Sequence, residues 1–307
     1  MNILDALINR PLGFLLGEIY ALIGSYGLAI ILFTLIVKIV LFPLSINQQK
    51  TMARTGRIQP KIKEIEKKYK GDKQKQSEEL MKLYQKEGIN PASGCLPLLI
   101  QMPFIYALYN IVNKPLSYLV GLTQEQILLI TEKMNLLTAD GIAYTLDGIK
   151  NAEITIAHQI STSAATIPSE FSGMVLIDFN FLGMNLASRP SWGTFDTLLL
   201  IPIIACASAF ASSYLMSKIS ATNATNAQAK TMNKSMMLMM PVMSLMLCFS
   251  VPAGVGLYWA MSNMFTIVQQ YVLNKMYPPS KADNNHKPSD QDTPKKNKPI
   301  RGVTLND

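Results

Sequence analysis

The chain has 307 residues, of which 49% are apolar and only 16% are charged, and its formal net charge at pH 7 is +8. A water-soluble domain carries about 25% charged residues, so this composition excludes an ordinary soluble enzyme domain. It predicts an all-α polytopic membrane protein, with apolar helices that cross the bilayer and positive charge concentrated in the segments between them.

The N-terminal segment, residues 1–23, is predicted to be an amphipathic helix at the outer surface of the membrane. Its apolar residues are interrupted by Asp5, Arg10 and Glu18, which is typical of a helix that lies in the plane of the interface. Because the segment lacks both a basic start and a small-residue cleavage site, we expect that it is not removed as a signal peptide.

Five apolar runs have the length, or nearly the length, that a helix needs to cross about 30 Å of hydrocarbon. None of them contains Asp or Glu, and only the first contains a cation, Lys38. The predicted spans are 24–44, 94–113, 197–216, 236–251 and 253–273.

Orientation follows from the distribution of Lys and Arg, because positively charged loops resist translocation. Segments 45–93, 217–235 and 274–307 hold 22 of the 28 cations, whereas segments 1–23 and 114–196 hold only five. The first three segments are therefore predicted to be cytoplasmic. With five crossings, the N-terminus lies outside and the C-terminus lies in the cytoplasm.

The cytoplasmic segment 45–93 is predicted to form a basic helical hairpin between the first two spans. Apolar residues recur at steps of four, three and four from Ile58 to Tyr69, which places them on one side of a helix, and Gly71 ends that helix before a second one begins. The segment contains 12 cations and 6 acids. This excess favours a polyanionic neighbour, either anionic lipid or the RNA of a ribosome, but a merely solvated hairpin explains it equally well.

Two other polar segments carry less information. The tail, 274–307, is nearly devoid of apolar residues after its start, so it is predicted to be disordered, and its cations permit contact with a ribosome. The outer segment, 114–196, has helical periodicity in its first part but no assignable function. His158 lies there without a Cys or a second His nearby, so a metal site is not predicted.

Lys38 is the one charged residue within the predicted spans. A lysine at the membrane centre costs roughly 2.5–3.5 kcal/mol on insertion scales and usually faces a protein interior or a wet cavity. The alternative is that its side chain reaches toward the cytoplasmic surface, about 9 Å away. Polar residues in several spans favour a hydrated groove that is open to the cytoplasm. The candidate groove residues are Thr34, Lys38, Gln101, Ser262 and Asn263.

The fourth predicted span is short and rich in methionine, including Met240 and Met243. A short span thins the bilayer locally, and methionine adapts to many apolar partners. These two residues are therefore candidate substrate contacts. Methionine that only fills gaps between helices would explain the composition equally well.

Four stretches of the chain carry long and specific motifs. They are TLIVKIVLFPLSINQQKTMA, RIQPKIKEIEKKY, LMKLYQKEGINPASGCLPLLIQMPFIYALY and MMPVMSLMLCFSVPAGVGLYWAMSNMFTIVQQ. These motifs, within residues 24–113 and 197–275, closely resemble the bacterial YidC-type membrane protein insertases of the YidC/Oxa/Alb family. The resemblance implies a five-helix core in the bacterial plasma membrane. It also implies an insertase and chaperone that inserts and folds nascent membrane proteins, alone or with the Sec translocon.

The resemblance further implies which residues act. The family has a cytoplasm-facing hydrophilic groove with an essential cation, usually arginine, and the matching position here is Lys38, which keeps the charge but loses the bidentate fork. Groove and substrate-contact positions carry over to Thr34, Gln101, Tyr258 and Trp259. The outer segment does not follow the family closely, so its role is not implied.

No enzyme is predicted, because the sequence has no nucleophile and base pair, metal-ligand cluster or glycine-rich phosphate loop. No cofactor or metal is expected, and the scattered Cys95, Cys206 and Cys248 indicate neither a disulfide framework nor a metal site. The main alternative to an insertase is a small-anion transporter that uses Lys38, although the two halves of the chain show no repeat. A third interpretation is a scaffold that tethers ribosomes.

Overall fold

The computed structural model describes residues 4–89, 96–193, 195–221 and 227–278. Regular structure in these ranges is helical apart from one short antiparallel hairpin of strands β1 (Asn180–Phe181) and β2 (Met184–Asn185). The predicted helical class is therefore confirmed. The α-helices are α1 (Arg10–Ile23), α2 (Tyr26–Val40), α3 (Phe42–Arg57), α4 (Gln59–Lys68), α5 (Lys73–Lys86), α6 (Leu96–Asn113), α7 (Gln124–Lys133), α8 (Leu146–Thr162), α9 (Leu200–Ala221), α10 (Ala227–Ser250) and α11 (Ala253–Met276). Shorter helical turns are η1 (Asp5–Asn9), η3 (Leu116–Val120), η4 (Ala164–Thr166), η5 (Ser169–Phe171) and η6 (Thr197–Leu199).

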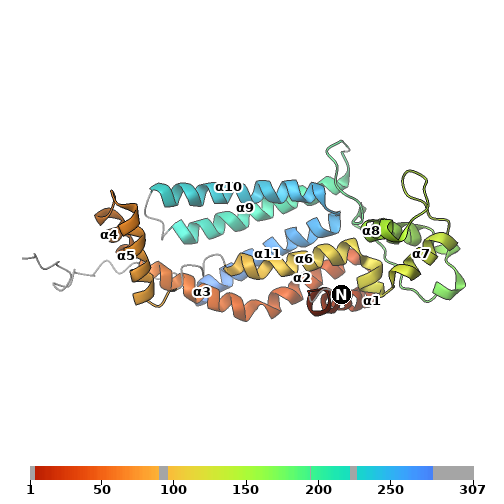
Figure 1. The fold of residues 1–307 in the computed structure, drawn as a ribbon, viewed down its shortest axis with the longest axis horizontal. Coiled ribbons are helices and arrows are strands. Elements are labelled where there is room, and N and C mark those ends of the chain that lie inside the picture. Colours follow the sequence, from red (N-terminus) through yellow and green to blue (C-terminus); the bar gives the residue numbers. More distant parts are fainter. Residues whose placement is uncertain (1–3, 90–95, 194, 222–226, 279–307) are drawn as a thin grey trace, which may run out of the picture.

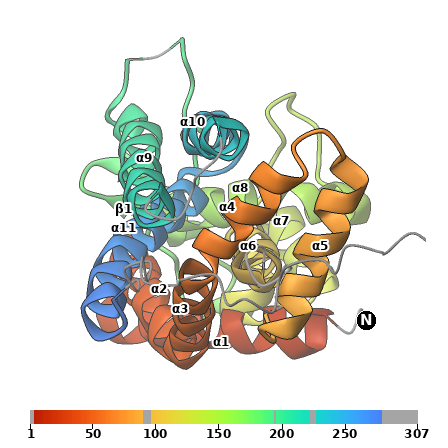
Figure 2. The same ribbon diagram turned by 90° about the vertical axis from the view of Figure 1, so that its left-hand side faces the viewer.

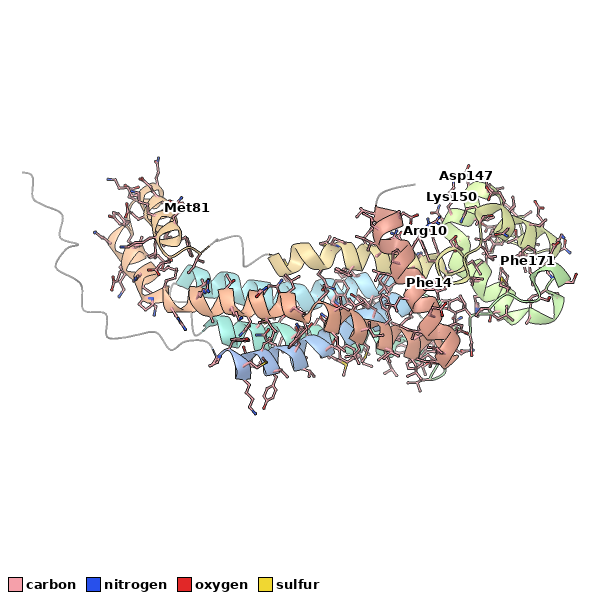
Figure 3. All side chains as sticks on the ribbon, turned by 90° about the horizontal axis from the view of Figure 1, so that it is seen from below. Arg10, Phe14, Met81, Asp147, Lys150 and Phe171 are labelled. Atoms are coloured by element: carbon pink, nitrogen blue, oxygen red, sulfur yellow. The ribbon has the colours of Figure 1, made fainter. Side chains whose placement is uncertain are left out.

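The long helices form an elongated bundle with a different cap at each end. Figure 1 shows α2, α3, α6, α9, α10 and α11 running along the long axis, with α4 and α5 at one end and α7 and α8 at the other. In Figure 3, Met81 of α5 lies at the first end, whereas Asp147, Lys150 and Phe171 lie at the opposite end. The segments predicted to lie on opposite sides of the membrane therefore lie at opposite ends of the bundle.

Helix length and composition identify fewer spans than the sequence predicts. Among the described residues, Asp5–Ile23 and Thr197–Met216 are long and apolar enough to cross a membrane, and the bent pair Tyr26–Val40 and Phe42–Arg57 makes a third if it is one span. Pro241–Ser250 is a shorter apolar helix. Five crossings and their orientation stay predictions.

The first predicted span, 24–44, is not one straight helix. Gly24, with φ of +70°, ends α1 in the left-handed conformation, which glycine adopts without strain. Helix α2 then ends at Val40, and α3 leaves at an angle of 53°. Pro43 lies in the first turn of α3, where its missing N–H is tolerated but where it interrupts a continuous helix.

Helix α1 lies across the bundle rather than along it. Figure 2 looks along the bundle, and α1 runs across the foot of that view, whereas Figure 1 shows the same helix end-on. Its glycines contact η3 closely: a Cβ atom on Gly13 would lie 2.8 Å from Tyr118 Cβ. Tyr20 donates to the Leu176 carbonyl and accepts from the Asp178 N–H, both at 2.8 Å. Helix α1 is thus fastened to the outer segment.

The outer segment is also joined to the bundle through the start of α11. The first N–H groups of a helix have no partner within it. Here the N–H of Ala253 donates to the Ser188 carbonyl at 2.8 Å, and the N–H of Gly254 donates to the Leu186 carbonyl at 2.9 Å. These backbone bonds hold the outer segment against the end of the bundle.

Helices α4 and α5 pack on a small core of their own. Ile58, Ile62, Leu83 and Ile89 are buried there, with Ile65, Leu80 and Tyr84 packed around them. The Lys61 ammonium and the Glu87 carboxylate pair at 2.7 Å on the surface of this hairpin. The apolar residues recognised by their spacing therefore lie between the two helices, and the cations lie outside.

Candidate functional site

A row of polar residues follows one ridge of α11. Its members are Tyr258, Ser262, Thr266, Gln270 and Asn274. Residues four apart are neighbours on a helix surface, and such a row is inclined to the helix axis, so successive members face different neighbouring helices. We call this set the α11 polar row.

The row begins at Tyr258, which is only 3% exposed. Gln101 of α6 donates from Nε2 to the Tyr258 hydroxyl at 3.0 Å. Two residues from different predicted spans thus meet through their polar atoms. A buried tyrosine hydroxyl needs such a partner, so this pair fixes α6 against α11.

Lys38 of α2 meets the row at Thr266. Lys38 Nζ donates to Thr266 Oγ1 at 3.0 Å, and Thr266 Oγ1 donates to the Ser262 carbonyl at 2.7 Å. Within the described ranges, no carboxylate forms an ion pair with Lys38. An ammonium has three N–H donors, and the described residues accept from only one of them.

The row ends in a buried amide network that joins α11 to α3. Gln270 Nε2 donates to Gln49 Oε1 at 2.9 Å and to Asn274 Oδ1 at 3.1 Å, and Gln49 Nε2 donates to Asn274 Oδ1 at 2.8 Å. Gln49 is 3% exposed and Gln270 is 8% exposed. These bonds satisfy groups that would be costly to bury alone. They also hold α3, which leaves α2 at an angle, against α11.

Two predicted groove residues lie apart from these contacts. Thr34 is 1% exposed, and its hydroxyl donates to the Ile30 carbonyl of its own helix at 2.6 Å, so it packs in the core instead of meeting Lys38. Asn263 has a buried Nδ2 atom that finds no hydrogen-bond partner in the described part of the chain. Its amide is therefore a donor without an acceptor, beside Ser262 of the polar row.

Among the predicted substrate-contact residues, Tyr258 meets α6, whereas Trp259 lies toward α9 and α10. Trp259 packs against Ala205 of α9 and Cys248 of α10, whereas Met243 is 41% exposed. The side chain of Met240 lies outside the described residues. Large apolar side chains are exposed along α10: Leu238, Met239, Val242, Met243, Met246 and Leu247.

The residues predicted from the sequence did not include Thr266, Gln270 or Gln49. A signal was present for the first two, because the polar residues of α11 recur at steps of four from Tyr258 to Asn274. Gln49 had no such signal, since it belongs to a polar helix in which amides are common. Its burial depends on how α3 packs against α11.

The described residues include no group of three or more His, Cys, Asp or Glu side chains that could hold a metal ion. Cys206 and Cys248 are free thiols, and Cys95 lies outside the described residues.

The sequence model of the family described as 60Kd inner membrane protein matches residues 18–281. Among curated proteins, the membrane protein insertase YidC of Prosthecochloris aestuarii is 31% identical over 253 residues, which are 82% of this chain and 34% of that protein. The membrane protein insertase YidC of Fusobacterium nucleatum is 27% identical over 275 residues, which are 90% of this chain and 98% of that protein. The chain thus spans about a third of the first relative and nearly all of the second. Since the match covers most of its length, this protein belongs to the 60Kd inner membrane protein family, which includes the YidC-type insertases, and the predicted resemblance is confirmed.

Proposed function

We propose that this protein is a membrane protein insertase and chaperone of the bacterial plasma membrane. It inserts and folds nascent membrane proteins without a nucleotide cofactor, through a hydrophilic groove that is open to the cytoplasm. The observation that carries the proposal is Lys38, a cation that meets the α11 polar row at the Thr266 hydroxyl and has no carboxylate partner among the described residues. A charge in that position favours a function over a structural role.

The proposed groove lowers the cost of moving a polar segment into the membrane. A polar group that enters hydrocarbon without a hydrogen bond costs roughly 2–7 kcal/mol. Lys38 has two N–H donors and Asn263 has an amide N–H group for which the described residues supply no acceptor, and the hydroxyls of Ser262 and Thr266 can both donate and accept. Acidic and polar residues of a substrate's outer segment would exchange bonds with these groups.

The apolar segment of the substrate is proposed to leave past α10. Met243 and its exposed neighbours present flexible side chains that fit many sequences. Tyr258 and Trp259 are proposed contacts at the boundary between the polar row and the apolar helices, and Met240 of α10 completes the proposed contact set. The substrate would then pass into lipid without a dedicated pocket.

The topology is proposed to be five crossings, with the N-terminus outside and the C-terminus cytoplasmic. Helix α1 lies across the bundle and is bonded to the outer segment, which supports a position in the outer interface for residues 1–23. The hairpin within 45–93 and the tail 274–307 are proposed to contact the ribosome and anionic lipids on the cytoplasmic side. The Sec translocon is a proposed partner for substrates with larger outer domains.

Site-specific photocrosslinking to a stalled nascent membrane protein tests this function. Probes at Gln101, Met243 and Trp259 are expected to crosslink to the apolar segment of the substrate, and a secreted soluble chain is the control. No crosslink from any of the three positions would contradict the insertase proposal.

The free donors of Lys38 also suit a second candidate function, which is transport of a small anion. Saturable uptake of an inorganic anion by proteoliposomes, lost in a Lys38→Met variant, would support it. Uptake no faster than in empty liposomes, together with crosslinks to nascent chains, would leave the insertase as the function.

A further inference from the structure

A basic cavity lies where α3 passes the C-terminal end of α11. Its volume is about 390 Å³, and its walls include Lys50, Arg54, Arg57, Tyr277 and Pro278. The three cations are four and three residues apart on α3, so they share one side of that helix. None of them forms an ion pair with a carboxylate in the described part of the chain.

The α3 wall of this cavity is joined to the end of α11 through the buried Gln49. Gln49, next to Lys50, donates to Asn274 Oδ1 at 2.8 Å and to the Tyr277 carbonyl at 3.4 Å. The Lys50 ammonium lies 5.1 Å from the centre of the Tyr277 ring, a cation–π distance. The cations therefore meet the end of α11 at a fixed position.

In the proposed topology, the cavity lies at the level of the phosphate groups of the cytoplasmic leaflet. This step depends on that topology. The last proposed span ends at residue 273, and Tyr277 follows at about 6 Å along a helix axis. The polar layer on each side of the hydrocarbon is about 5–7 Å thick, and tyrosine is enriched at that level. The cytoplasmic leaflet is also the one rich in anionic lipid.

We propose that this cavity binds the phosphate of an anionic phospholipid. Arg54 and Arg57 supply forked donors that match phosphate geometry, and Lys50 adds a third positive charge. Met276, which also lines the cavity, is exposed and offers an apolar surface to an acyl chain. An RNA backbone would need a longer track of cations than one cavity of this size provides, so a lipid headgroup fits better.

The test is lipid binding by the full-length protein in detergent, measured by native mass spectrometry during titration with phosphatidylglycerol. Each cation near an anionic surface contributes on the order of fivefold to affinity, so the double variant Arg54→Gln and Arg57→Gln is expected to bind roughly 25-fold more weakly. The matched control is Lys150→Gln with Arg189→Gln, which removes the same charge from exposed positions of the outer segment and is expected to bind like wild type. Binding of phosphatidylcholine should be weak in all three proteins.

Equal weakening in the two double variants would overturn the proposal, because the lipid would then respond to net charge and not to this cavity. Displacement of the lipid by millimolar inorganic phosphate, or by an oligoribonucleotide, would assign the cavity to a soluble anion or to RNA instead. Arg54→Lys with Arg57→Lys keeps the charge and should recover part of the affinity. Because the readout is lipid binding and not insertion, its outcome is independent of the proposed insertase function.

Discussion

Two charged residues with little exposure, one in the outer segment and one in the bundle, have contrasting surroundings. The outer one is Glu153 of α8, which is 0% exposed and accepts from the Ser117 N–H at 2.5 Å, the Ser117 hydroxyl at 2.9 Å and Gln124 Nε2 at 3.3 Å. In the bundle, Lys38 donates to a single described acceptor, Thr266 Oγ1, at 3.0 Å. One charge is saturated with hydrogen bonds, and the other is not.

The difference separates a charge that holds the structure together from one that we propose to be functional. A saturated buried carboxylate fixes the groups that bond to it, here η3 at the end of α6 and the first turn of α7, and removing it leaves their donors unpaired. An ammonium with free donors costs stability in an apolar bundle. Such a cost is expected where a side chain must bind something that comes and goes.

The largest expected effect is on stability and concerns Glu153. Glu153→Ala leaves the Ser117 N–H and the Gln124 amide without their acceptor, at about 1–3 kcal/mol for an unpaired buried group, and it opens a cavity. The free energy of unfolding in detergent should fall by about 3 kcal/mol. Glu153→Gln keeps one oxygen acceptor and should lose less. An alanine variant as stable as wild type would show that these bonds do not matter.

The next effect is on activity and concerns Lys38. Lys38→Met removes the charge from a similar volume, and the insertion rate of a single-span substrate with an acidic outer segment should fall about tenfold, which corresponds to 1.4 kcal/mol. Thermal stability should not fall, because a partly buried charge with no carboxylate partner among the described residues is lost. Lys38→Arg should stay active. Unchanged insertion by both Lys38→Met and Lys38→Ala would make the groove charge irrelevant.

For Lys38, much of this contrast was visible in the sequence. Lys38 stands out because a cation is rare within an apolar run, and Gln101 and Tyr258 were singled out with it. Their mutual contacts were not predictable, since the face that α11 turns to α2 is decided by tertiary packing. Thr34 shows the limit: it is one turn from Lys38, yet its hydroxyl bonds its own helix.

Glu153 was not singled out from the sequence, although the pattern of its helix contained the signal. In α8, Glu153 occupies the buried stripe formed by Ile149, Ile156 and Ile160, where an apolar residue would be expected. An acid in such a stripe indicates a buried hydrogen-bond network. Its partners, however, belong to η3 and to the start of α7, and no spacing in the chain points to them.

A smaller effect on insertion tests whether Lys38 depends on its hydroxyl partner. Thr266→Val removes the acceptor at nearly constant volume, and one hydrogen bond is worth about 0.5–1.5 kcal/mol, so insertion should change by roughly threefold. Thr34→Val is the matched control, because that hydroxyl bonds only the Ile30 carbonyl. Equal insertion defects in both variants would mean that loss of a hydroxyl, and not its contact with Lys38, causes the effect.

The smallest expected effect is a dependence of stability on pH that belongs to Glu153 alone. Burial raises the pKa of this carboxyl above its usual value, against the opposing effect of the bonds from Ser117 and Gln124. The folded state therefore holds the proton to higher pH than the unfolded state does, and stability is lost as pH rises from the unfolded pKa through the folded one. The difference in unfolding free energy between wild type and Glu153→Gln, which cannot titrate, should accordingly shift against wild type over that interval and then level off. Other carboxyls titrate equally in both proteins and cancel.

A difference that is constant with pH would mean that the hydrogen bonds to Glu153 offset the effect of its burial completely. A difference that shifts in favour of wild type would mean that these bonds outweigh burial and that Glu153 is held as an anion.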